Sequence, residues 1–234
     1  SNGVIVTDKT GNPVVLRTQN VTLRRSMPNK PITVIYRSEG SGTSDNLTMA
    51  FKALSPSLWT TSNSSFASAF PGGSSALANL AGSFRGVAAS SGVALEASRT
   101  PYSITYAEVG FAASPYNLSV TNILNKAGNA ITPSAATAMA AAAQATVKSD
   151  GTVTFKYDTT DPDAYPFTAT TYALALTDYN SATKAKGVKD ALEYIAFNCA
   201  KDTATNNAAA GFGIYTEANA FAKAFRTQLA KLGK

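Results

Sequence analysis

The sequence predicts an α/β fold with mostly parallel sheets flanked by helices. Segments that read as strands alternate along the chain with segments whose apolar residues recur at helical spacing, and this alternation is typical of such folds. The length of 234 residues and the hydrophobic content of 44% suffice for a substantial core. We therefore expect one large domain or two smaller lobes.

The pattern predicts each strand and helix from its local residues. Apolar residues between Asp45 and Leu54 recur on one helix face, and Pro56 ends that pattern. Ser134 precedes an alanine-rich stretch and is suited to cap it as a helix. The expected elements are two short strands over 3–16, a strand over 32–37, helices over 45–54 and near 86–97, a strand and the start of a helix over 102–112, a helix over 134–147, strands over 151–157 and 168–176, and helices over 187–200 and 217–232. A Ser/Gly-rich passage, 60–75, and a polar segment with proline, 158–167, connect them.

The composition excludes several kinds of catalytic site. Histidine is absent and Cys199 is the sole cysteine, so neither a Ser-His-Asp nor a Cys-His arrangement can form, and a conventional zinc site lacks its ligands. Cys199 lies in an apolar helical stretch, which favours a core position over a nucleophile. We therefore expect a protein that is not an enzyme and that holds no metal and no cofactor.

The charged residues favour a small anion over nucleic acid. Lys and Arg total 20 against 14 Asp and Glu, but the basic residues are scattered and only Arg24 and Arg25 are adjacent. A modest positive field of this kind attracts small anions. The sequence contains no run of about 18 apolar residues, so it predicts no membrane-spanning helix. Abundant Ala, Thr, Ser and Asn with 15% charged residues are typical of an exported bacterial protein, and the start at Ser-Asn-Gly reads as a mature or excised piece.

The segment YRSEGSGTS, residues 36–44, lies between a predicted strand and a predicted helix. A glycine-rich turn that opens a helix leaves backbone N–H groups directed into one small space, with the positive end of the helix dipole behind them. Arg37 adds a forked cation suited to a tetrahedral oxyanion. The loop supplies flexible backbone and hydroxyl groups at Gly40, Ser41, Gly42, Thr43 and Ser44. These features predict an anion site.

An ordinary helix start explains the same loop chemistry equally well, with Thr43 or Ser44 as the cap and Arg37 solvated. A nucleotide P-loop is excluded because no lysine follows Gly42. The motifs KTG, SDN and SATK of penicillin-recognising enzymes occur in reverse order, which circular permutation cannot produce, so we interpret them as chance matches.

The segment PITVIYRSEGSGTSDNLTMAF, residues 31–51, resembles the signature of the phosphate-binding proteins of bacterial phosphate ABC transporters. In that family a strand, an Arg-Ser-Asp/Glu-Gly-Ser-Gly-Thr-Thr/Ser loop and a helix hold the anion. Residues 82–112 are similar to a further family segment, with Tyr102 and Thr105 where glycines are usual. Residues 165–176 look like the passage in which the chain returns to the first lobe. The resemblance extends from about Pro31 to the end.

The resemblance implies a periplasmic-binding-protein-like fold of type II with one full lobe plus a partial second lobe. Residues 1–30 would form a hairpin and linker, 31–160 the anion-binding lobe, and 161–234 the crossing segment and the C-terminal part of the other lobe. The implied function is extracytoplasmic binding of inorganic phosphate or a similar oxyanion for ABC-transporter uptake. The implied partner is an ABC permease, and the implied location is the periplasm or the cell surface after secretion.

The resemblance also implies roles for single residues. Arg37 would pair with phosphate, while Ser41, Gly42 and Thr43 would donate hydrogen bonds to it through hydroxyl and amide groups. Glu39 matches an acidic residue that restrains the arginine in the family; its alternative is a solvated loop carboxylate. The remaining loop residues, Ser38, Gly40 and Ser44, would support the site.

The chain also departs from the family pattern. The family's first lobe begins with a Gly-Ala-Thr-Phe-type loop and contributes an Asp that accepts the phosphate proton, and the sequence shows neither. We therefore expect weak binding, on the order of 0.1 to 1 mM, with little preference between phosphate and sulfate. The alternatives are a surface domain of this fold that no longer binds phosphate tightly and a phosphatase on the same scaffold. An exposed edge at the strand over 168–176 would favour a homodimer.

Overall fold

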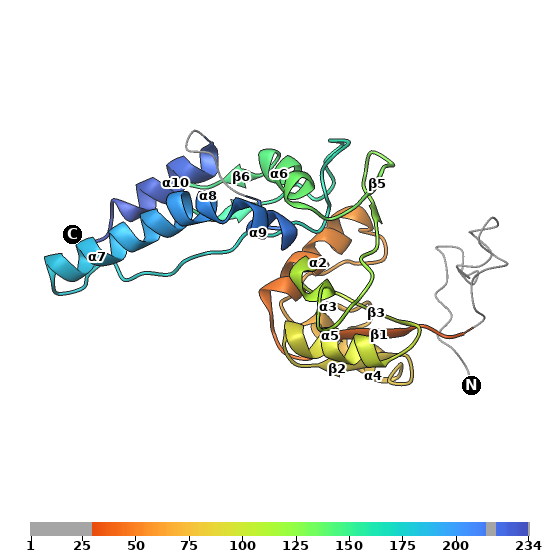
Figure 1. Ribbon diagram of the computed structural model, residues 1–234. Coiled ribbons are helices and arrows are strands. Elements are labelled where there is room, and N and C mark those ends of the chain that lie inside the picture. The colour runs from red at the N-terminus through yellow and green to blue at the C-terminus, as the bar shows by residue number, and fades with distance from the viewer. Residues whose placement is uncertain (1–29, 214–218, 234) are drawn as a thin grey trace.

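The computed structural model describes residues 30–213 and 219–233 (Figure 1). The two strands predicted over 3–16, and the hairpin and linker predicted over 1–30, lie outside the described residues apart from Lys30. The division of the chain at residues 30 and 160 stays a prediction. Among the described helices, none combines the length and the apolar character needed to cross a bilayer.

The first three described strands form a three-stranded parallel sheet. Its strands are β1, Thr33–Arg37, β2, Phe84–Val87, and β3, Ser103–Thr105, in the order β2-β1-β3. Val34 pairs with Phe84 and with Ile104 on the two sides of β1. The strand predicted over 32–37 is therefore confirmed as the middle strand, and the sheet has the expected parallel pairing.

Helices cover both faces of this sheet (Figure 1). They are α2, Gly42–Leu54, α3, Phe66–Ala69, α4, Gly73–Ala78, and α5, Ser90–Arg99. Side chains alternate between the two faces of a strand, so adjacent residues of β1 enter different clusters. Ile35 packs with Val93 of α5, whereas Tyr36 packs against the cluster that contains Phe66. The α/β architecture with helices flanking a parallel sheet is thus confirmed.

The remainder of the chain contains two short antiparallel strand pairs and several helices. Ser134 caps α6 as predicted, and Thr137 completes a capping box with it. Cys199 is only partly buried, so its predicted core position is wrong. The strand pairs are β4, Ile123–Leu124, with β5, Ala130–Ile131, and β6, Thr146–Val147, with β7, Val153–Thr154; the helices are η1, Val109–Ala112, α6, Ala135–Ala143, α7, Ala182–Glu193, the π-helical η2, Tyr194–Cys199, α8, Ala200–Asp202, α9, Ala204–Ala209, and α10, Ala220–Leu229.

Between residues 60 and 97 the predicted helix is present, but a strand and two short helices were not predicted. Residues 84–87 form β2 by pairing with β1, and the helix that was predicted near 86–97 begins only at Ser90. The passage over 60–75 includes α3 and the start of α4, because Phe66 and Leu77 bury their side chains in the core. In both cases tertiary packing overrides the local pattern.

The strand predicted over 168–176 is also wrong, since these residues form no regular element. No described strand pairs with the segment. Its large side chains are exposed, with 97% of Leu174 and 65% of Leu176 accessible to solvent. The strand edge that would favour a homodimer is therefore missing from the described residues, and the homodimer stays a prediction.

Candidate functional site

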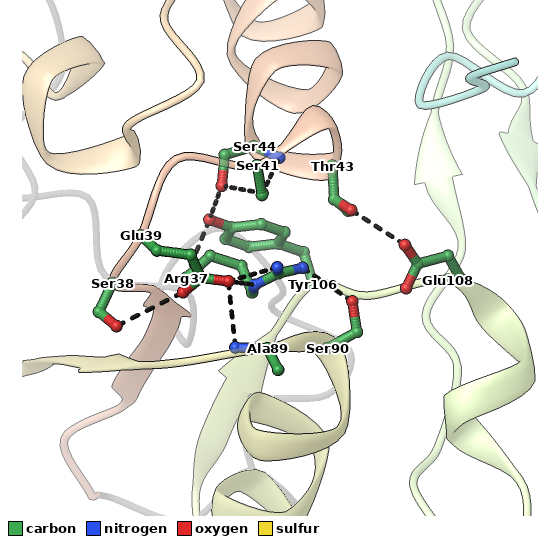
Figure 2. Close-up of polar contacts among 10 residues, drawn as sticks. All are labelled: Arg37, Ser38, Glu39, Ser41, Thr43, Ser44, Ala89, Ser90, Tyr106 and Glu108. Atoms are coloured by element: carbon green, nitrogen blue, oxygen red, sulfur yellow. Dashed lines mark hydrogen bonds and ion pairs between the residues drawn. The ribbon is translucent and has the colours of Figure 1, made fainter. Parts of the chain in front are cut away.

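The candidate site lies where the three parallel strands end. β1 ends at Arg37, β2 at Val87 and β3 at Thr105, so the segments that follow them meet at one edge of the sheet. In α/β proteins, ligands bind at the carboxyl ends of parallel strands. Figure 2 shows the side chains that meet there, which come from Arg37 to Ser44, from Ala89 and Ser90, and from Tyr106 and Glu108.

The Arg37 side chain is held by contacts from two of these segments. Its Nε donates to Glu39 Oε1 at 2.6 Å, its Nη2 forms an ion pair with the same oxygen, and its Nη1 donates to Ser90 Oγ at 2.8 Å. With 13% of its side chain exposed, Arg37 is not solvated as the alternative interpretation required. Within residues 30–213 and 219–233 these terminal nitrogens have no other acceptor, so the second N–H of each is left for a further one.

Glu39 joins the end of β1 to the start of α5. Besides Arg37, its carboxylate accepts the Ala89 backbone N–H at 3.1 Å and, in a long contact of 3.5 Å, the Ser38 hydroxyl. The hydrogen bond from Arg37, together with smaller backbone contributions, lowers the pKa of Glu39. Ala89 has φ of 64°, a backbone conformation that costs a residue other than glycine about 1–3 kcal/mol. Glu39 thus pairs with Arg37, and the restraining role that the resemblance implied stays a prediction.

Helix α2 begins at the predicted loop, three residues before the predicted start, with Ser41 as its cap. Ser41 Oγ accepts the Ser44 N–H at 3.0 Å, so the expectation that Thr43 or Ser44 caps the helix is wrong. The Ser41 N–H donates to Ser64 O at 2.9 Å, and its hydroxyl contacts Ser44 Oγ at 3.0 Å. Both groups that were expected to donate to phosphate from Ser41 are therefore used within the protein.

The backbone N–H groups of Gly42 and Thr43 form the open part of this helix start. Neither has a hydrogen-bond acceptor within the described ranges. A Cβ placed on Gly42 would meet no atom within 4 Å, so the space beside it is open, whereas one on Gly40 would lie 3.4 Å from Ser64 Oγ. The amides of the first turn are the groups that a helix offers to an anion. Of the predicted donors, the backbone amides of Gly42 and Thr43 can therefore still bind an anion.

Tyr106 ties the end of β1 to the start of α2, a role that the sequence did not reveal. Its hydroxyl accepts the Arg37 backbone N–H at 3.1 Å and lies 2.7 Å from the hydroxyl of fully buried Ser44. Burial raises the pKa of Tyr106, so this hydroxyl stays protonated at neutral pH. Ser44 is thus a structural support of the helix start.

We expect Tyr106→Phe to lower the free energy of unfolding by about 1–3 kcal/mol, because it leaves the Arg37 N–H without its acceptor. The Ser44 hydroxyl also loses a contact, although it keeps the one with Ser41. Urea denaturation measures the change, and Tyr102→Phe is the control, since that side chain is 50% exposed. Equal stability of the two variants would show that Tyr106 does not organise the site.

Glu108 is a second carboxylate at the site that the sequence did not single out. It follows β3, and its Oε1 accepts the Thr43 hydroxyl at 3.0 Å (Figure 2). Burial raises the pKa of Glu108, but hydrogen bonds from its own backbone, Ser90 and Thr43, with the charge of Arg37, outweigh this effect and lower it. Glu108 is therefore ionised at neutral pH. Its place directly after a strand of a parallel sheet is the signal that could have identified it.

A parallel sheet with polar groups at its carboxyl edge is the arrangement at which α/β proteins bind ligands. A family model described as PBP superfamily domain matches residues 15–198 and so includes every segment of the site. The chain therefore belongs to the PBP superfamily, and its fold is the expected periplasmic-binding-protein-like one. Members of this superfamily are typically binding proteins rather than enzymes. A search of curated proteins found no match.

Proposed function

We propose that this domain binds inorganic phosphate or a similar oxyanion outside the cytoplasm, for uptake through an ABC permease. The observation that carries the proposal is the placement of Arg37 beside the start of α2. Among the described residues, two N–H groups of its guanidinium and the amides of Gly42 and Thr43 have no acceptor, and we expect them to bind one ligand. A forked cation and a helix N-terminus both favour a tetrahedral oxyanion.

The dipole of helix α2 supports this assignment. The helix has 13 residues, and its first turn faces the same edge of the sheet as Arg37. A helix dipole stabilises a negative charge near the N-terminus by about 0.3–1 kcal/mol at an exposed surface and by more in a partly buried site. Because the Arg37 side chain is mostly buried, its hydrogen bonds to a ligand form where solvent screens them less.

The first test is a calorimetric titration of phosphate at low salt into the native chain and the Arg37→Ala variant. We expect the native chain to bind with a dissociation constant on the order of 0.1 to 1 mM. Loss of the charged hydrogen bonds, each of about 1.5–3 kcal/mol, should weaken binding by about 10- to 100-fold.

The matched control is Arg85→Ala, which removes an exposed arginine of β2 that pairs with Glu96. This variant should bind phosphate like the native chain. Binding that survives Arg37→Ala would remove Arg37 from the site. Absence of binding by the native chain would favour a surface domain of the same fold that no longer binds phosphate tightly.

A further inference from the structure

Glu108 carries a negative charge at the site that no described cation neutralises. Both carboxylates there, Glu39 and Glu108, have a lowered pKa and are ionised at neutral pH. Arg37 forms its ion pair with Glu39. Within residues 30–213 and 219–233, no lysine or arginine lies within ion-pair distance of Glu108. The described side chains of the site therefore hold two negative charges against one positive charge.

Two hydroxyl groups hold the Glu108 carboxylate in place. Thr43 donates to its Oε1 at 3.0 Å, and the Ser90 hydroxyl is also hydrogen-bonded to it. A carboxylate has about four lone-pair sites on its two oxygens, so it can accept further donors. Because Glu108 is exposed, the donors of a ligand can reach these sites.

Ser90 lies between the Glu108 carboxylate and the Arg37 guanidinium (Figure 2). Arg37 Nη1 donates to Ser90 Oγ at 2.8 Å, and the same hydroxyl is hydrogen-bonded to Glu108. Two hydrogen bonds in series span no more than about 6 Å. Thr43 also contacts both regions, because its backbone N–H is one of the amides expected to bind the anion and its hydroxyl donates to Glu108. A group that can bind a cation therefore lies directly beside the proposed position of the oxyanion.

We propose that the site takes an oxyanion that carries an ammonium group a few bonds away, with Glu108 as the partner of the ammonium. The oxyanion accepts from Arg37 and from the amides of Gly42 and Thr43, while the ammonium donates to the Glu108 carboxylate. Such a zwitterion supplies the positive charge that the two carboxylates lack. The ligand class is therefore that of short aminoalkyl phosphates and phosphonates. The inference rests on the proposed function, because the oxyanion binds to the same groups.

The exposure of Glu108 limits how much the ammonium contributes to binding. A solvent-exposed ion pair changes an equilibrium by about fivefold or less, and a charge-assisted hydrogen bond of fixed geometry changes it by about tenfold or more. Glu108 is exposed, but Thr43 and Ser90 fix its carboxylate. We therefore expect the ammonium group to tighten binding by about five- to tenfold.

The test is calorimetry at pH 7 and low salt with 2-aminoethylphosphonate and propylphosphonate, in which a methyl group replaces the ammonium. The native chain should bind 2-aminoethylphosphonate about five- to tenfold more tightly, and Glu108→Gln should reduce this ratio to about one. A second pair, 2-aminoethanesulfonate and propane-1-sulfonate, repeats the comparison with an anion that carries no proton at this pH. Glu96→Gln is the control, because Glu96 pairs with Arg85 away from the site, and it should keep the native ratio.

A titration of inorganic phosphate into Glu108→Gln shows whether this variant keeps a folded site. Glutamine has nearly the same shape as glutamate and removes the negative charge, so the variant should bind phosphate at least as tightly as the native chain does. Weaker phosphate binding by the variant, with no change in the ratio for the two sulfonates, would assign Glu108 to a proton of the anion and overturn the inference.

The outcomes separate this inference from the proposed function. Equal binding of the two members of each pair by the native chain, with phosphate binding that Arg37→Ala weakens, would overturn the role of Glu108 and leave oxyanion binding in place. A native preference that Glu108→Gln does not change would also overturn the role of Glu108. Binding of 2-aminoethylphosphonate without binding of phosphate would support the inference and exclude inorganic phosphate as the ligand. If the native chain binds none of these compounds, both proposals fail.

Discussion

Phe66→Ala is expected to lower the free energy of unfolding by about 3–5 kcal/mol, the range for removal of a buried aromatic ring. Phe66 is 4% exposed and lies in the cluster between the sheet and helix α2. Its ring centroid is 5.1 Å from that of Tyr36 and 5.7 Å from that of Tyr106. The variant leaves a cavity next to the residue that joins β1 to α2, so the loss combines lost transfer free energy with lost aromatic contacts.

Urea denaturation of the native chain and the variant measures this effect. Phe212→Ala is the matched control, because Phe212 is 50% exposed and its removal should cost less than about 1 kcal/mol. A cost below about 1 kcal/mol for Phe66→Ala as well would mean that the aromatic cluster is not the main core of this lobe.

Gly211→Ala is expected to lower the free energy of unfolding by about 2–5 kcal/mol. Gly211 has φ of +77°, and a Cβ built on it would clash with Val109 Cγ1. The left-handed backbone costs an alanine about 1–2 kcal/mol, and overpacking adds about 1–3 kcal/mol. Val109 follows Glu108 directly, so relief of the clash would shift the segment that carries the second carboxylate of the site.

A matched control separates the two contributions. Gly128 also has positive φ, +90°, but a Cβ there would meet no atom within 4 Å. Gly128→Ala should therefore lower the free energy of unfolding only by the penalty for the left-handed backbone, about 1–2 kcal/mol. Equal thermal denaturation midpoints for the two variants would show that residues after Gly211 adjust freely and that the contact with Val109 does not constrain Glu108.

The strand β1 and the helix α2 could be predicted because their patterns are local and unambiguous. ITVIYR contains β-branched residues in a short apolar run, and the apolar residues after Asp45 recur at helical spacing. β2 could not be predicted, because Phe84–Val87 is short and contains Gly86, and it becomes a strand only by pairing with β1. Residues 168–176 show the converse, since a strand-like pattern has no neighbour to pair with among the described residues.

The candidate site likewise contains residues that a local sequence pattern predicts and residues that it does not. The loop from Arg37 to Ser44 is continuous in sequence, so its chemistry could be interpreted directly and through the family resemblance. The use of Ser41 as a cap depends on the first turn of α2 and on Ser64, which the loop sequence does not specify. Tyr106 and Glu108 enter the site because β3 pairs with β1, a contact that no local pattern indicates.

The place of β1 in the middle of the sheet governs when the site forms during folding. Val34 pairs with Phe84 on one side and with Ile104 on the other, so both neighbours lie far along the chain. Such non-local parallel pairing must overcome a large loop-closure entropy and is slow. During synthesis, the loop after β1 leaves the ribosome long before Tyr106, which holds the Arg37 backbone. We therefore expect assembly of the candidate site and closure of this sheet to be one late event in folding.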